Sequence, residues 1–221
     1  IGVTGVQTCA LPISELLAAS GEAVIERDDR LEAFDRLQLP AGAALSRAST
    51  VRVGQAVGAS MVISGSVAMP SDQLVVKARV VRLDSGRLLP EVEATGPLSN
   101  MFGVFGRLAQ RIRESDAPLP PVGERLPPTP QVLELYVKGL IAETPSTALA
   151  FLDQALKAAP LFDRARLAIW ELHTEASEHQ KALDALAAVR PESRYAREGK
   201  FRRALSFLNL KRWDEALQTL R

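Results

Sequence analysis

The feature that most constrains the fold is a pattern, Ala-Leu-x-x-Leu, that returns every 34 residues in the second half of the chain. Its copies begin at Ala148, Ala182 and Ala216. A fixed period of this size is typical of helical hairpins that stack one on the next, because each hairpin alone leaves an apolar face uncovered. Arrays of this kind offer extended surfaces that bind other proteins. The spacing therefore favours a binding protein over an enzyme.

Composition and charge are those of an ordinary globular protein. Of the 221 residues, 47% are hydrophobic and 24% are charged, which is typical of folded domains. A net charge of +1 gives no overall field that would attract nucleic acid or an anionic membrane. The apolar runs are shorter than the roughly 18 residues that a membrane-spanning helix needs. We therefore expect one or two globular domains, no nucleic-acid partner and no transmembrane segment.

The first thirteen residues differ in character from the rest of the chain. The run from Val3 to Ile13 resembles the in-frame translation of a common sequencing-library adapter. Residues 1–13 are therefore expected to be an artefact outside the fold, the alternative being a native segment. The single cysteine, Cys9, lies in this stretch, so no disulfide or thiol chemistry is expected. With the natural start expected to be missing, a signal sequence cannot be judged.

A proline-rich stretch divides the remaining chain in two. Six of the 14 prolines lie between Ala117 and Pro130, a density that favours extended backbone and a semi-rigid spacer. The alternative is a ligand for a proline-recognising protein at residues 118–121. We expect a linker at residues 114–130, with one domain at 14–113 and another at 131–221.

The first half predicts an α+β domain in which helices pack on a small sheet. A hairpin at Asp84–Gly86, with glycine at the left-handed position, places Lys77 opposite Glu93 and Arg79 opposite Glu91. Such cross-strand ion pairs give these charges a structural role. The predicted elements begin with a strand at 22–27, a helix capped by Asp28 or Asp29 and a helix at 46–57. Strands at 60–68 and 74–83 follow, with a third strand after the hairpin. A closing helix carries one apolar stripe: Leu98, Met101, Phe102, Phe105, Leu108, Ala109 and Ile112.

The order of these elements resembles a group of bacterial domains. The segments that carry the resemblance are residues 24–27, residues 57–59 followed by 62–67, and the charged hairpin that ends at 84–86. The group includes the amino-terminal domain of the TolB translocation protein, the FlgO-like flagellar outer-membrane proteins and the curli-secretion lipoprotein. The resemblance covers the part of the chain from Ser14 to Arg113. Members of the group usually begin with a strand, and that strand is absent from this part. The resemblance implies a non-enzymatic domain of the bacterial cell envelope or periplasm.

The second half is similar to tetratricopeptide repeats. The period, the small residue that opens each copy and Pro160 after the first hairpin agree with that family. The resemblance implies an all-α array of about three repeats at 131–221, whose last helix is expected to be cut short. Tyr136 and Trp170 depart from the family, since a small residue is expected there, and Ala204 fits.

Candidate partner-binding residues lie in the groove that the resemblance predicts along the first helix of each repeat. The repeat register gives Arg164, Leu167, Glu171, Thr174, Glu198, Phe201, Leu205 and Asn209. Arg202 and Arg203 join them from a basic region, residues 190–221, with nine basic and four acidic residues. That region either attracts an acidic peptide or protein or is a solvated helix face.

No group of residues predicts catalysis, a cofactor or a metal site. His173 and His179 are six positions apart and fall on different faces of a helix. The glycines lack the spacing of a phosphate-binding loop. We therefore expect neither an enzyme nor a bound cofactor or metal.

Three functions are consistent with the sequence. The first is a non-enzymatic scaffold of the bacterial envelope whose repeats bind a protein or peptide. The second is a cytoplasmic regulatory or sensor fragment of a larger signalling protein, such as a kinase, a cyclase or a transcription regulator. The third is an enzyme whose active site lies in missing parts of the chain. The partner and the oligomeric state are not specified by the sequence.

Overall fold

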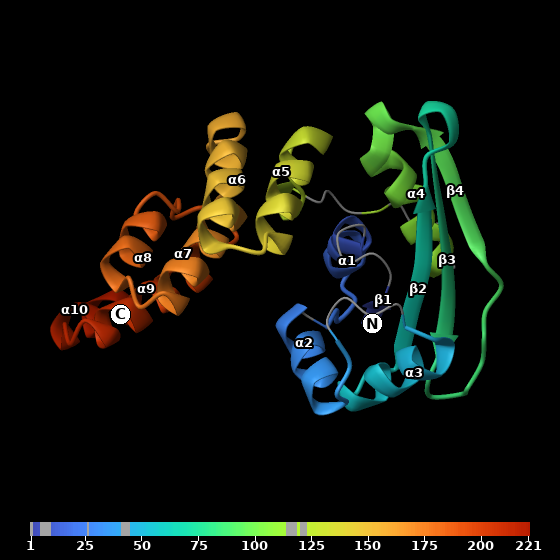
Figure 1. Ribbon diagram of the computed structural model, residues 1–221, viewed down its shortest axis with the longest axis horizontal. Coiled ribbons are helices and arrows are strands. Elements are labelled where there is room, and N and C mark those ends of the chain that lie inside the picture. The colour runs from blue at the N-terminus through green and yellow to red at the C-terminus, as the bar shows by residue number, and fades with distance from the viewer. Residues whose placement is uncertain (1, 5–9, 26, 41–44, 114–118, 120–122) are drawn as a thin grey trace. The chain divides into compact units, whose positions relative to one another are not determined.

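The chain forms two compact units, Ile1–Val122 and Gly123–Arg221. The computed structural model describes residues 2–4, 10–25, 27–40, 45–113, 119 and 123–221, drawn in Figure 1. Residues 114–118 and 120–122 of the expected linker lie outside the described residues. Its last part belongs to the second unit, where Leu126 is buried.

The first unit contains a sheet in the order β1-β2-β3-β4. β1 (Gly2–Thr4) pairs in parallel with β2 (Met61–Ala68), and β2, β3 (Gln73–Arg82) and β4 (Val92–Pro97) form an antiparallel meander. Along β3 the even-numbered residues from Leu74 to Val80 are buried, as expected for a sheet with one covered face. The expectation of an α+β domain with a small antiparallel sheet is confirmed.

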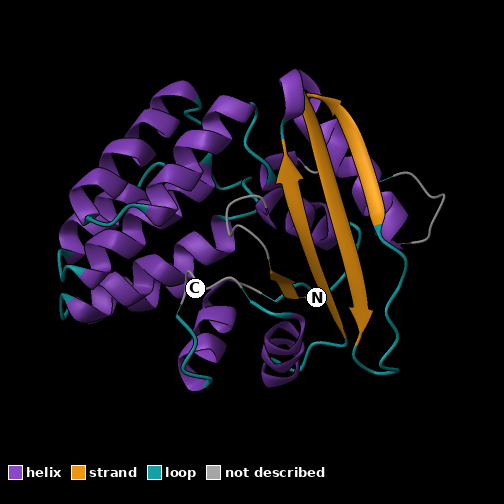
Figure 2. Ribbon diagram, turned by 45° about the vertical axis from the view of Figure 1, so that its right-hand side comes forward, coloured by secondary structure: helices purple, strands orange, loops and turns teal. Residues whose placement is uncertain are grey.

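Helices cover one face of this sheet (Figure 2). α4 (Met101–Arg113) contacts β3, β4 and α1 (Ala10–Ala19), while α2 (Arg27–Arg36) contacts α3 (Arg47–Ala56). The predicted stripe of α4 is buried from Phe105 to Ile112, but Leu98 lies in a preceding 3₁₀ turn and is exposed. Ser46 caps α3 by accepting a hydrogen bond from Ser49 N, as expected for the predicted helix at 46–57.

Two expectations for the amino-terminal part are wrong. The strand predicted at 22–27 does not form: residues 22–25 have no regular structure and α2 begins at Arg27. Glu22 N donates to Leu17 O and Gly21 adopts a φ of 88°, so this segment ends α1 in a glycine turn. Asp28 and Asp29 accordingly lie in the first turn of α2 and not before it.

Part of residues 1–13 belongs to the fold, against expectation. β1 pairs with the edge of β2, and α1, which begins at Ala10, buries Ile13 beside Leu16 and Leu17. Ile13 is three and four residues before Leu16 and Leu17, an apolar helical spacing that the sequence interpretation set aside when it excluded residues 1–13. The origin of the segment as a translated adapter is untested and stays a prediction, and Cys9 lies outside the described residues.

The predicted strand register is correct over most of the β3–β4 hairpin. Lys77 faces Glu93, and the two form an ion pair of 3.1 Å. Arg79 and Glu91 form another of 2.9 Å. Glu93 raises the pKa of Lys77 through its hydrogen bond to the ammonium group. All four side chains are substantially exposed, so solvent screens both pairs and they add little to stability.

Nearer the loop the register shifts by one residue. Val81 pairs with Leu88, and Arg82 N donates to Arg87 O, whereas the prediction set Leu83 opposite Arg87. One extra residue on the β4 side, next to Pro90, accounts for the difference. Proline has no N–H to contribute to the ladder, so a bulge is tolerated there.

The second unit is an array of three helical hairpins. Their bounds are α5 (Pro130–Ile141) with α6 (Pro145–Ala158), α7 (Asp163–Glu175) with α8 (His179–Leu186), and α9 (Ala196–Asn209) with α10 (Trp213–Leu220). Thr129 and Thr144 cap α5 and α6 by accepting hydrogen bonds from Val132 N and Thr147 N, each just before a proline. The expected helical array is confirmed. No helix in the described part of the chain is long and apolar enough to cross a bilayer.

Each hairpin buries the small residue of the repeated pattern. Ala148, Ala182 and Ala216 are at most 3% exposed on α6, α8 and α10. The helices of the first hairpin approach closely, since a methyl group added at Gly139 would lie 2.7 Å from Leu152 Cγ. Larger residues at these positions would meet the facing helix.

We predict that Ala148→Leu destabilises the second unit by about 1–3 kcal/mol, because a well-packed interface has no room for three more carbons. Ala150→Leu, two positions away on the exposed side of α6, is the matched control and should change stability by less than about 0.5 kcal/mol. Urea unfolding followed by tryptophan fluorescence measures both, since Trp170 and Trp213 lie in this unit. Equal effects of the two substitutions would contradict the packing.

Candidate protein-interaction surface

All ten predicted partner-binding residues lie on α7 and α9, the first helices of the second and third hairpins. These two helices contact each other. α7 carries Arg164, Leu167, Glu171 and Thr174, and α9 carries Glu198, Phe201, Arg202, Arg203, Leu205 and Asn209.

The residues on α7 are mostly covered. Leu167 is 5% exposed and lies in a cluster with Trp170, Leu186 and Tyr195. Arg164 is half-buried, donates to Arg125 O at 3.4 Å and lies 5.8 Å from the centre of the Tyr136 ring. Glu171 and Thr174 are half-buried as well. The predicted residues on α7 are therefore mostly packed against their neighbours, and little of them is accessible to a partner.

The residues on α9 include an exposed stripe. Glu198 and Asn209 are exposed, Leu205 is half-buried and Phe201 is 55% exposed. Their spacing of three or four residues places them on one side of the helix, and residues of the opposite side, Ala204, Ser206 and Phe207, are buried. We call Glu198, Phe201, Leu205 and Asn209 the exposed α9 face, in which Leu205 also packs against the buried cluster of Leu167 and Leu186.

Arg202 joins α9 to α7 and so has a structural role. Its guanidinium lies 4.8 Å from the centre of the Trp170 ring, donates to Leu167 O at 3.1 Å and pairs with Glu198 at 2.8 Å. Trp170 Nε1 in turn donates to Ser206 Oγ at 2.8 Å. A tryptophan at a position expected to be small is thus accommodated by a hydrogen bond and a cation–π contact.

Pairing also reduces the free charge of the basic region, residues 190–221. Arg212 forms a bidentate pair with Glu215 and lies 4.7 Å from the centre of the Phe207 ring. This pairing raises the pKa of Arg212 and lowers that of Glu215 through the shared hydrogen bonds. The half-buried Arg203 has its Nε atom buried, without a hydrogen-bond partner among the described residues. Four exposed cations show no ion pair with any described residue: Arg197, Lys200, Lys211 and Arg221.

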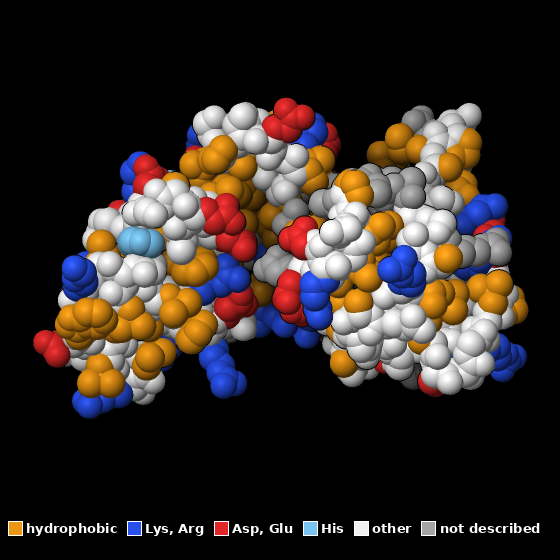
Figure 3. Space-filling model, turned by 60° about the horizontal axis from the view of Figure 1, so that its bottom comes forward, with side chains coloured by type: hydrophobic (Ala, Val, Ile, Leu, Met, Phe, Trp, Pro, Cys, Tyr) orange, Lys and Arg blue, Asp and Glu red, His pale blue; other side chains and the backbone are white. Residues whose placement is uncertain are grey.

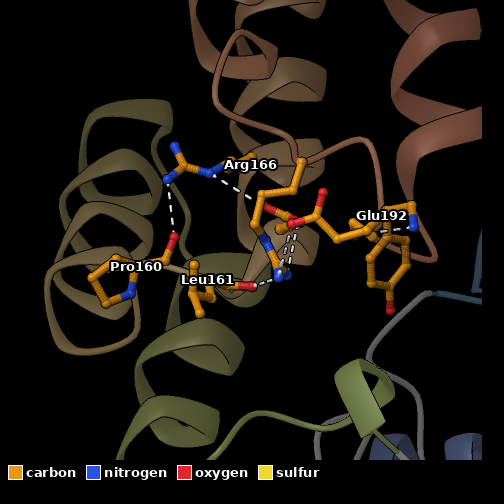
Figure 4. A network of polar contacts seen from close by, with 8 residues as sticks. Pro160, Leu161, Arg166 and Glu192 are labelled. Atoms are coloured by element: carbon orange, nitrogen blue, oxygen red, sulfur yellow. Dashed lines mark hydrogen bonds and ion pairs between the residues drawn. The ribbon is translucent and has the colours of Figure 1, made fainter.

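A network of polar contacts surrounds Asp163, at the start of α7, and Figure 4 shows Pro160, Leu161 and Arg166 in it. Its carboxylate is 1% exposed, and it pairs with Arg190 at 3.2 Å and with Arg166 at 3.4 Å. Arg190 also donates to Leu161 O, and Arg166 donates to Pro160 O. The network therefore joins the segment after α6, the start of α7 and the segment after α8. Sequence reasoning missed it and assigned Arg190 to a basic surface.

The two histidines do not form a site together. His173 Nδ1 lies 2.8 Å from Glu178 Oε2, and Lys181 donates to the other carboxylate oxygen at 2.7 Å. The Lys181 hydrogen bond, followed by that of His173, lowers the pKa of Glu178. These contacts tie the end of α7 to the start of α8. No group of three or more potential metal ligands occurs among the described residues.

We predict that Asp163→Asn destabilises the second unit by on the order of 3 kcal/mol, because it leaves two guanidinium groups without their shared counter-charge in a largely buried setting. Asp153→Asn removes an exposed carboxylate on α6 and should change stability by less than about 0.5 kcal/mol. Urea unfolding monitored by tryptophan fluorescence compares the two. Similar small losses for both variants would show that the network does not hold the hairpins together.

Comparisons with known proteins give little similarity. No family model matches the chain, and no curated protein matches it. Among solved structures, the C-terminal domain of LpoB from Salmonella enterica has a TM-score of 0.34 and 13% sequence identity. The alignment covers 37% of this chain and 61% of that domain. A likeness at this level transfers neither a fold nor a role from one chain to the other.

Proposed function

We propose that this protein is a non-enzymatic scaffold whose helical array binds a protein or peptide partner along the exposed α9 face. The observation that carries the proposal is the exposed stripe of α9, with Phe201 55% exposed at its centre on a helix whose other side is packed into the array. Aromatic side chains that are held rigidly and left accessible are frequent anchors of protein interfaces.

The repeat assignment supports the same function. Three hairpins follow one another with the register of the 34-residue pattern, and each buries its small residue at the corresponding position. We assign them as tetratricopeptide-like repeats. In solenoid arrays the first helices form the surface that partners contact, and α7 and α9 are those helices here.

The preferred partner is acidic. Arg197 and Lys200 are exposed on α9 without an ion pair among the described residues. They raise the local positive potential beside Phe201, which accelerates the approach of an acidic partner more than it strengthens the final complex. Arg202 does not serve this purpose, because Trp170, Leu167 and Glu198 already engage it.

We also propose a location in the bacterial cell envelope. It rests on the sequence resemblance of residues 14–113 to the TolB-like group, whose members are mostly envelope proteins. A regulatory fragment in the cytoplasm would use the same array in the same way. The binding experiment below therefore applies to either location.

We predict that Phe201→Ala weakens partner binding by about 2 kcal/mol, roughly thirtyfold, since truncation of a central aromatic anchor typically costs that much. Asn209→Glu, at the end of the same stripe, should weaken an acidic partner further through like-charge repulsion. Proteins that co-purify with the 221-residue chain are identified first, and the affinity of each variant for them is then measured by calorimetry.

Asp153→Ala, exposed on α6, is the matched control and should bind like the parent protein. Retention of full affinity by both Phe201→Ala and Asn209→Glu would exclude the exposed α9 face as the binding surface.

A further inference from the structure

β4 forms one edge of the described sheet, with β3 as its neighbour (Figure 2). In an antiparallel pair, the backbone groups of successive residues point alternately towards the partner strand and away from it. Val80 O accepts a hydrogen bond from the segment that leads into β4, so Val76, four residues earlier, also faces β4. Val76 pairs with Ala94. Glu93 and Thr95, on either side of Ala94, therefore direct their N–H and C=O groups away from β3, along the outer edge of the sheet.

Two arginines of α4 bind the outward carbonyls of this edge. Arg107 Nη2 donates to Thr95 O at 2.8 Å, and Arg111 Nη1 donates to Glu93 O. Four residues of a helix rise by about 6 Å, and two residues of a strand rise by about 6.7 Å. The spacing of the two arginines along α4 therefore matches the spacing of the two carbonyls along β4. We call Arg107 and Arg111 the edge guard.

The end of β4 is adapted to the edge guard. A methyl group added at Gly96 would lie 2.9 Å from Arg107 Nη2 and 2.8 Å from a methyl carbon of Val104. The guanidinium thus lies in space that a side chain at position 96 would fill. Pro97, the next residue, has no N–H with which another strand could pair. A cation and a missing donor therefore occur side by side along the same edge.

The outward groups of β4 are complementary to those of a second copy of the strand. In an antiparallel pair of two β4 strands centred on Ala94, Glu93 of one copy faces Thr95 of the other. Each such pair exchanges two backbone hydrogen bonds, and the acceptors are the carbonyls that the edge guard binds. Glu93 faces a threonine and not another carboxylate, so like charges do not oppose the pairing. The edge guard and a second β4 strand therefore compete for the same two oxygens.

We propose that the edge guard keeps β4 from pairing with β4 of a second copy of this chain. Edge strands offer unpaired backbone groups to other chains, and charged side chains are a common protection against such pairing. Here the charges engage the edge carbonyls directly. Figure 3 shows Lys and Arg side chains next to Asp and Glu side chains at the right-hand margin of the first unit, the side on which β3 and β4 lie in Figure 1. The edge guard is separate from the exposed α9 face, which belongs to the second unit.

Analytical ultracentrifugation of the 221-residue chain tests the proposal with the double variant Arg107→Ala plus Arg111→Ala. We expect this variant to dimerise with a dissociation constant at least about tenfold lower than that of the parent protein, because both carbonyls become available to a second copy. Both arginines are exposed, so their replacement leaves the fold intact, which circular dichroism verifies. If the double variant loses its fold, the single variants Arg107→Ala and Arg111→Ala provide the same measurement.

Two further variants separate edge pairing from other causes of association. Arg52→Ala plus Arg87→Ala removes two exposed positive charges elsewhere in the first unit and should leave the monomer–dimer equilibrium unchanged. Thr95→Pro, added to the double variant, removes an outward N–H that the pairing of two β4 strands requires. Because this N–H points away from β3, proline is tolerated at such an edge position. The triple variant should therefore be as monomeric as the parent protein.

Three results would overturn the proposal. The first is a double variant that is as monomeric as the parent protein. The second is equal dimerisation of the Arg52→Ala plus Arg87→Ala control, which would assign the effect to net charge. The third is dimerisation that Thr95→Pro does not reverse, which would place the contact on another surface.

Discussion

The packing of each helical hairpin on the one before it is the constraint on which the second unit depends. Leu183 and Leu186 are buried because side chains of α9 and its flanking residues cover them: Phe207, Leu210, Tyr195 and Leu205. A single hairpin has too little apolar contact to be stable alone, so stability in such an array comes from these interfaces. The same geometry that stabilises the array leaves the corresponding residues of the last hairpin exposed.

Polar contacts fix how the hairpins meet, and they do so at buried positions. Asp163 joins the segments on either side of the second hairpin through Arg166 and Arg190. Arg202 and Ser206 hold the ring of Trp170 between α7 and α9. Directional contacts of this kind add specificity of arrangement to an interface that apolar packing alone defines less sharply. They also withdraw several arginines from the surface that a partner could contact.

The sequence predicted the elements that depend on local signals and on fixed periods. The helix predicted at 46–57 forms at Arg47–Ala56, and the charged pairs Lys77–Glu93 and Arg79–Glu91 appear as ion pairs. Predictions failed in short segments where a glycine turn or a proline overrides the residue pattern. The strand at 22–27 did not form because that segment ends α1, and the register beside the hairpin loop depends on a bulge next to Pro90.

The candidate site, too, was predicted only in part from the sequence. The repeat register placed all ten residues on α7 and α9, but it did not reveal which of them a neighbouring helix would cover. Leu167 is buried and Phe201 is exposed at equivalent positions, and Leu167 is covered by Tyr195 and Leu205, which lie more than 25 residues later in the chain. The sequence predicted Arg202 as part of a basic surface. Its contacts with Trp170 and Leu167 were not foreseen because these residues lie more than thirty positions earlier in the chain.

The central claim is that the hairpins of the second unit are held by their packing on one another, with α9 and its flanking residues covering Leu183 and Leu186. Amide hydrogen exchange of the intact protein, followed residue by residue, tests it most directly. The account predicts that α8, whose apolar side is covered, exchanges more slowly than α10, whose Leu217 and Leu220 are exposed. Exchange in α10 as slow as in α8 would contradict it.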